Sequence, residues 1–151
     1  MTTTPNVPEN VSAKSANIEL QTRLYGYFSS GRLDDVLTHA TDDVVIEMIP
    51  FGQVHHGHGG FRKFLTAFTT AFPDIRIETR RQVADETRVA AEFVAYGTHK
   101  GPLMTPAGPI PPTGKKVVFT VCEVWDFRDG KLAGVRNYQD AASILRQIGA
   151  A

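Results

Sequence analysis

The stretch KKVVFTVCEVWDFRDGKLAGVRNYQ, residues 115–139, carries the strongest fold signal in the chain. Its two ends, 115–127 and 131–139, are rich in β-branched and aromatic residues and predict strands, because such side chains pack well on a pleated sheet. Arg128-Asp129-Gly130 lies between them and predicts a tight turn, since Asp-Gly readily adopts the positive φ angles of hairpin turns. We therefore expect a long antiparallel hairpin.

The segments before this hairpin predict further strands and several helices. Residues 75–83 and 87–99 show the period-two alternation of half-exposed strands. Apolar residues at helical spacing predict helices near 17–28, 33–39 and 61–72. Early helices followed by antiparallel strands are typical of an α+β fold. In such a fold a curved sheet wraps around the helices and leaves a conical interior that can hold a ligand.

Three shorter segments complete the expected order of elements. Residues 44–49 predict a strand that ends at Pro50. The glycine-punctuated segment 51–60 predicts a loop before the next helix. Residues 103–112 are rich in proline and predict a stiff loop, which we expect to cover the entrance of the interior.

Length and composition predict one domain over residues 15–151. The chain has 151 residues, enough for a single core and a modest cavity. Residues 1–14 are rich in Thr, Pro, Asn and Ser and predict a flexible tail, because they offer little apolar surface to bury. The start of the chain lacks the basic end and apolar stretch of a signal peptide, so we expect a cytoplasmic location.

The charge pattern narrows the classes of partner. The chain has 16 Lys and Arg residues and 16 Asp and Glu residues, and the positive ones are scattered along the sequence. We therefore expect no nucleic-acid partner. No run approaches the roughly 20 apolar residues of a membrane helix, so we expect no membrane partner either. A neutral chain offers little repulsion between copies, which favours a homodimer or larger homo-oligomer.

The cysteine and histidine residues do not predict a metal or redox site. Cys122 is the only cysteine and reads as a small core residue. His55, His56 and His58 fall in one loop, but neighbouring histidines point apart, and no carboxylate or cysteine lies at ligand spacing. We expect no metal and no cofactor.

Strand parity places one carboxylate among apolar side chains. The odd positions of 117–127 are large and apolar except for Glu123, and a buried, unpaired carboxylate costs several kcal/mol. Glu123 must therefore be paired, protonated or close to water. Arg136, Tyr138 and Asp140 share one parity, and if their face is the inner one, Arg136 can pair with Glu123 or Asp140. A purely structural ion pair between Glu123 and Arg136 remains an equal alternative.

Two further polar residues have both a catalytic and a structural interpretation. Asp140 joins the last strand to an amphipathic segment at 141–149, where burial can raise a carboxyl pKa toward the range useful for proton transfer. An Asp at such a place also caps helices by accepting backbone hydrogen bonds. His99 ends an apolar strand row, either as a polar partner in a site or as a histidine bonded to a loop carbonyl.

Five segments resemble the SnoaL-like polyketide cyclases, which have the nuclear transport factor 2-like fold. The resemblance runs from about residue 16 to the end, in order and at the family's spacing. The segments are Ala71–Asp74, Gly97–Pro102, Pro111–Lys115, Arg128–Leu132 and Asp140–Gly149.

The resemblance implies an α+β cone with an internal pocket and an intramolecular aldol ring closure of an aromatic polyketide ester. It also implies an acid/base at Asp140 and no cofactor or metal. His99 or Tyr138 would then stabilise the enolate oxygen. One departure lies on the last strand, where many relatives carry a Glu-His-Trp-Asp-like stretch and this chain has Gly134-Val135-Arg136-Asn137.

Residues and resemblance together give a candidate site for a small hydrophobic substrate. The catalytic candidates are Asp140, His99, Glu123 and Arg136. The substrate-binding candidates are Tyr138, His55, Phe51, Phe93, Phe119, Trp125 and Met104. The alternatives are a hydroxylase or epoxide hydrolase-like enzyme with an Asp140, Arg136 and Glu123 water site, and a non-catalytic ligand-binding module of the same fold.

Overall fold

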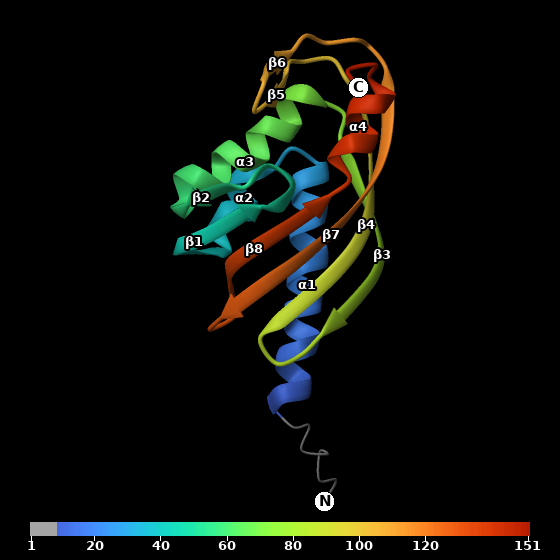
Figure 1. Cartoon of the computed structure of the whole chain (residues 1–151). Helices are drawn as coiled ribbons and strands as arrows, with labels where there is room; N and C mark the ends of the chain where they lie inside the picture. The colour runs from blue at the N-terminus through green and yellow to red at the C-terminus, as the bar shows by residue number, and fades with distance from the viewer. Residues whose placement is uncertain (1–8) are drawn as a thin grey trace, which may run out of the picture.

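A computed structural model describes residues 9–151 and shows a six-stranded sheet that curves around the N-terminal helix (Figure 1). The order across the sheet is β2-β1-β8-β7-β4-β3, so the expected α+β cone is confirmed. The helices are α1 (Glu9–Ser29), α2 (Leu33–Thr38), α3 (Gly57–Ala71) and α4 (Ala141–Gln147), with a 3-10 turn at Ile49–Phe51. The sheet strands are β1 (Ala40–Met48), β2 (Gln53–His56), β3 (Arg76–Ala84), β4 (Arg88–Thr98), β7 (Lys116–Arg128) and β8 (Lys131–Gln139). A separate hairpin consists of β5 (Leu103–Thr105) and β6 (Gly108–Ile110).

The expected hairpin is present as β7 and β8, with Asp129 (φ 52°) and Gly130 (φ 76°) in its turn. Its register changes close to the turn. Phe127 pairs with Leu132, whereas Asp126 pairs with Gly134, so Ala133 is an extra residue on β8. Such a bulge reverses which side chains of the strand face the core from that point on.

Other elements differ from the sequence-based expectations. The sheet is mostly antiparallel, but β1 runs parallel to β8. The predicted loop at 51–60 is wrong, because β2 pairs with β1 there and α3 already begins at Gly57. The strand was missed since its side chains are mostly exposed and show no apolar alternation. The predicted loop at 103–112 contains the β5–β6 hairpin.

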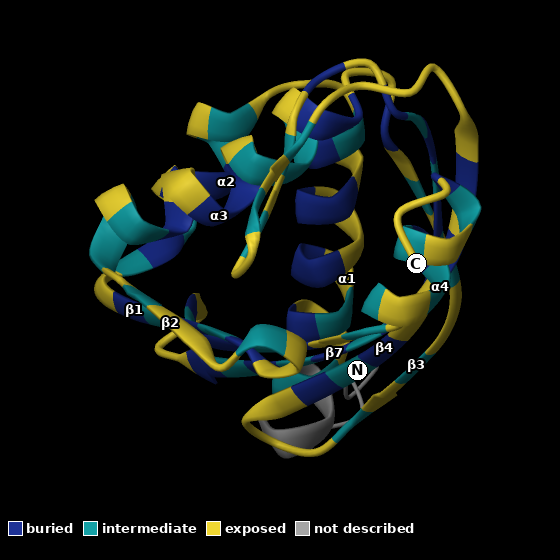
Figure 2. Cartoon of the chain, turned by 45° about the horizontal axis from the view of Figure 1, so that its top comes forward, coloured by how far each residue is buried: buried dark blue, intermediate teal, exposed yellow. Residues whose placement is uncertain are grey.

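Helix α1 runs along the concave side of the sheet, and Figure 2 shows its buried turns facing the interior. It begins at Glu9, earlier than the predicted start at Asn17. The prediction missed these first turns because the polar segment between the two residues has no apolar residues at helical spacing. Residues 1–8 of the predicted tail lie outside the described residues. No helix within 9–151 combines the length and apolar character needed to cross a membrane.

Candidate active site

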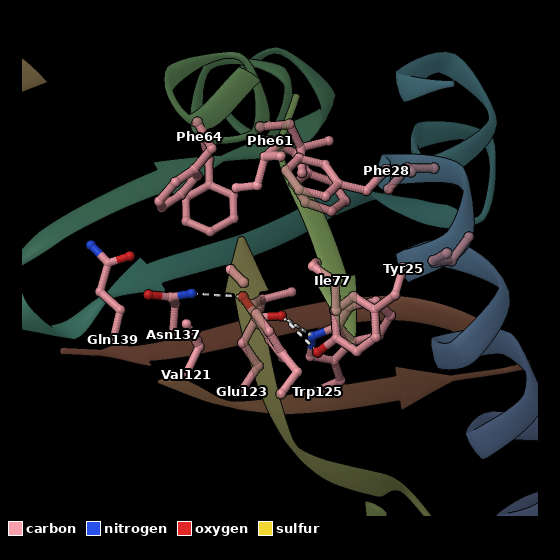
Figure 3. A pocket seen from close by; sticks show the side chains of 18 of the residues that line it. Tyr25, Phe28, Phe61, Phe64, Ile77, Val121, Glu123, Trp125, Asn137 and Gln139 are labelled. Atoms are coloured by element: carbon pink, nitrogen blue, oxygen red, sulfur yellow. Dashed lines mark hydrogen bonds between the residues drawn. The ribbon is translucent and has the colours of Figure 1, made fainter. Parts of the chain in front are cut away.

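A pocket lies between α1, α3 and the concave face of the sheet (Figure 3). Its empty volume is about 560 Å³, including space that opens to solvent. Phenyl rings of α3 line one wall, and a small polar cluster contributed by the sheet and by α1 faces them. The cluster, which we call the pocket floor, consists of Tyr25, Glu123, Trp125, Asn137 and Gln139.

Glu123 is the centre of the pocket floor and is only 5% exposed. Its Oε1 accepts hydrogen bonds from the Tyr25 hydroxyl at 2.8 Å and from the Trp125 indole N–H at 3.0 Å. Its Oε2 accepts a hydrogen bond from Asn137 Nδ2 at 2.7 Å. All three donors are neutral, so this buried carboxyl group is held by hydrogen bonds and not by an ion pair.

The electrostatics of the pocket floor favour the neutral form of Glu123. Burial raises the pKa of Glu123 above its ordinary value, and the hydrogen bonds from Asn137, Trp125 and Tyr25 oppose this rise only in part. Burial raises the pKa of Tyr25 well above its ordinary value, and the negative charge of the nearby Glu123 carboxylate adds a smaller increase. Tyr25 therefore remains a protonated donor, while the raised pKa of Glu123 moves its proton exchange to higher pH than for an ordinary glutamate.

Two acceptor atoms of the pocket floor lack a partner. Asn137 Oδ1 and Gln139 Oε1 are both buried, and neither has a hydrogen bond from the described residues. Both residues lie on β8 and project to the same side of the strand, with Asn137 next to Glu123 (Figure 3). A ligand in the pocket would therefore meet unpaired acceptors beside the carboxyl group.

Arg136 lies on the opposite face of the sheet from Glu123, so the predicted ion pair between them is wrong. Across the hairpin Glu123 pairs with Asn137, and Arg136 pairs with Val124. The guanidinium of Arg136 donates to Asp126 Oδ2 at 2.8 Å, and this pairing raises the pKa of Arg136. The bulge at Ala133 is the cause, because direct counting from the turn would have placed Arg136 opposite Glu123.

Asp140 is exposed at the N-terminus of α4 and does not line the pocket. Its Oδ1 accepts a hydrogen bond from Ser143 N at 3.1 Å, which is the helix-capping arrangement. The expected group of Asp140, Arg136 and Glu123 is therefore not brought together. The catalytic role of Asp140 stays a prediction.

His99 is fully buried beside Phe72 and also lies outside the pocket lining. Its Nδ1 lies 3.0 Å from Thr113 Oγ1 and accepts a hydrogen bond from Thr113 N at 3.3 Å. These contacts join the end of β4 to the segment before β7. His99 thus has a structural contact with a loop residue, although the partner is Thr113 and not the expected loop carbonyl.

The predicted substrate-binding residues divide into two groups. Phe93, Phe119 and Trp125 line the pocket as expected. Tyr138 and Met104 are exposed, while His55 and Phe51 are half-buried and lie outside its lining.

The sequence interpretation missed Tyr25, Asn137 and Gln139 as site residues. Tyr25 was assigned only to an amphipathic helix, and no local pattern marks it as a partner of Glu123. Asn137 and Gln139 would have emerged from the inner face of β8 if the extra residue in that strand had been recognised. Within residues 9–151, no group of three or more His, Cys, Asp or Glu side chains is arranged to hold a metal ion.

Comparisons with known proteins give consistent matches. Residues 18–148 match the family model described as SnoaL-like polyketide cyclase. Nogalonic acid methyl ester cyclase from Streptomyces nogalater is 28% identical over 123 residues, which cover 81% of this chain and 89% of that protein.

Two solved structures show the fold. A protein proposed to be a SnoaL-like polyketide cyclase from Jannaschia sp. CCS1 has a TM-score of 0.83 at 18% identity, with 99% of both chains covered. A proposed hydroxylase from Streptomyces galilaeus has a TM-score of 0.79 at 22% identity and covers 91% of this chain and 87% of its own. At these identities the two structures support the architecture alone.

Proposed function

We propose that this chain, which belongs to the SnoaL-like polyketide cyclase family, closes a ring in a hydrophobic, polyketide-like carbonyl substrate by intramolecular aldol chemistry without a cofactor. The proposed acid/base is Glu123. The observation that carries the proposal is a carboxyl group buried in an apolar pocket, held by neutral donors, with a raised pKa. A general base works best when its pKa lies near the working pH.

The proposed reaction is a proton transfer followed by bond formation between two carbons. The Glu123 carboxylate removes a proton from the carbon next to one substrate carbonyl, which gives an enolate and a protonated Glu123. The enolate carbon attacks a second carbonyl of the same molecule, and the new alkoxide takes the proton back from Glu123. No atom is gained or lost, so the product is an isomer of the substrate.

Asn137 is suited to assist this sequence at the enolate oxygen. Its amide carries two hydrogens, and the hydrogen bond to Glu123 uses one of them. The second hydrogen can stabilise negative charge that develops on a substrate oxygen beside Glu123. The Tyr25 and Trp125 donors meanwhile fix the carboxyl group in one orientation.

The test compares four proteins on nogalonic acid methyl ester and related anthraquinone-type polyketide esters. These are wild type, Glu123→Gln, Asp140→Asn and Asp126→Asn, with products followed by mass and chromatography. We expect wild type to form an isomer and Glu123→Gln to lose about 10²–10⁴-fold in kcat, the usual contribution of a general acid or base. Asp126→Asn is the control, because it neutralises a carboxylate on the outer face of the same strand.

Asp140→Asn separates the two acid/base candidates. Asn caps helices about as well as Asp, so this change removes the charge while the N-terminus of α4 remains capped. Loss of turnover in Asp140→Asn with full activity in Glu123→Gln would overturn our assignment in favour of Asp140. A product heavier by one oxygen or one water would indicate hydroxylase or hydrolase chemistry, and unchanged substrate would indicate a ligand-binding module.

A further inference from the structure

The hydrogen-bonding capacity of the pocket floor is unevenly distributed. Three of its donors are directed at Glu123: the Tyr25 hydroxyl, the Trp125 indole and one amide hydrogen of Asn137 all point to that carboxyl group. Its unpaired buried atoms are instead acceptors, Asn137 Oδ1 and Gln139 Oε1. A buried acceptor without a partner costs free energy, so these two oxygens favour a ligand that donates to them.

The placement of the two acceptors restricts where the ligand's donors must lie. Asn137 and Gln139 are two residues apart on β8, and their side chains start about 7 Å apart on one face of the strand. The opposite wall consists of apolar rings from α3, among them Phe61, Phe64 and Phe68. In Figure 3, Phe61 and Phe64 face the floor from across the pocket. A matching ligand presents two donors along one edge and an apolar ring body toward α3.

We propose that the pocket selects polyketide-like aromatic compounds that carry two hydroxyl groups along one edge, which donate to Asn137 Oδ1 and Gln139 Oε1. The inference rests on the proposed function for the choice of a polyketide-like ligand and adds its hydroxyl pattern. Compounds whose hydroxyl groups are methylated fit the apolar walls but leave both acceptors buried and unpaired. The pocket therefore discriminates between a hydroxylated compound and its methyl ether.

The test measures binding of small aromatic probes to the full chain through quenching of the fluorescence of Trp125, the single tryptophan. The first probe is 2,7-dihydroxynaphthalene, whose hydroxyl groups share one edge. The second is 2,7-dimethoxynaphthalene, which cannot donate, and the third is 2,6-dihydroxynaphthalene, whose hydroxyl groups lie on opposite edges. We expect the first probe to bind about tenfold more tightly than the second. The first donates a hydrogen bond to each acceptor, whereas the second buries both acceptors without a partner. The affinity of the third probe should lie between those of the first two.

Variants on β8 identify the atoms responsible. Gln139→Met keeps the length of the side chain and removes the acceptor, so it should reduce the preference for the dihydroxy probe to about threefold. Tyr138→Phe is the matched control, because Tyr138 lies between the two acceptors in sequence and is exposed on the opposite face. The preference should be unchanged in that variant.

Equal affinities of wild type for the hydroxylated and methylated probes would overturn this inference, as would absence of binding by all three. So would a preference that survives both Gln139→Met and Asn137→Leu, each checked for a cooperative thermal unfolding transition above the temperature of the binding measurement. Failure of the proposed function gives a different result. In that case the probes still discriminate, while Glu123→Gln turns over the polyketide ester as fast as wild type.

Discussion

Two carboxylates on the β7–β8 hairpin, Glu123 on the inner face and Asp126 on the outer face, are stabilised in opposite ways. Asp126 has a side chain that is 34% exposed, and it accepts hydrogen bonds from Arg88 at 2.9 Å and Arg136 at 2.8 Å. Glu123 is buried and accepts only from Tyr25, Trp125 and Asn137.

The difference shows how one hairpin can carry a carboxylate that stabilises the fold on one face and a carboxyl group suited to proton transfer on the other. A cation beside a carboxylate favours its ionised form, and such a pair contributes mainly to strand register and surface stability. Neutral donors hold a buried carboxyl group in place while its pKa remains raised. Proton transfer requires the second arrangement, which is why Glu123 and not Asp126 is the candidate acid/base.

Shifting β8 by one residue beyond the bulge should disturb this separation most. Inserting one alanine after Gly134 moves the following residues by one position relative to β7, which turns Arg136 and Tyr138 toward the interior and Asn137 and Gln139 away from it. We expect a loss of about 3 kcal/mol or more in the free energy of unfolding, because a buried network is broken. Urea unfolding of the insertion variant measures this loss.

The control for that insertion is Ala133→Gly, which keeps the length and register of β8 and should cost at most about 1 kcal/mol. An insertion variant as stable as wild type, with unchanged probe binding, would show that the register of β8 does not decide which face carries the site.

The raised pKa of Glu123 predicts a pH-dependent difference from the Glu123→Gln variant. Folding favours the protonated carboxyl group, so its contribution to stability is fully present below the ordinary Glu pKa of about 4.3. That contribution is lost as the pH rises through the raised pKa of the folded state, by about 1.4 kcal/mol for each unit of the shift. Wild type should therefore become less stable relative to Glu123→Gln over this window. Urea unfolding at a series of pH values tests it, and parallel pH profiles would contradict it.

The smallest effect is expected on the outer face. In Arg136→Leu, Asp126 keeps its contact with Arg88, and both members of the lost pair are partly exposed. The free energy of unfolding should fall by less than about 1 kcal/mol, with turnover within about twofold of wild type. Abolished turnover in a folded Arg136→Leu protein would instead favour the water site of Asp140, Arg136 and Glu123.

Much of the fold followed from local sequence patterns. The observed β8 has the predicted limits, and β4 and β7 match their predictions to within a residue at each end. The family resemblance is confirmed by the match over residues 18–148. Predictions failed where local pattern is absent, as at β2, whose formation depends on pairing with β1. The homo-oligomer and the cytoplasmic location stay predictions.

The candidate site was predictable only in part. Glu123 stood out because a carboxylate interrupted an apolar row, and its burial followed from that row. Its partners did not follow, since Tyr25 is 98 residues away and Asn137 faces it only because of the bulge. Asp140 was ambiguous, because the same residue type suits a helix cap and an acid/base.

The sequence by itself determined the main helices and long strands, the β7–β8 hairpin and the unusual position of Glu123, because these depend on propensity and periodicity along a short stretch of chain. The tertiary structure alone decided which residues surround that carboxyl group. A single extra residue in β8 reverses the faces of the strand and exchanges Arg136 for Asn137 beside Glu123. Side chains from distant elements then meet in one pocket, and no local pattern encodes that proximity.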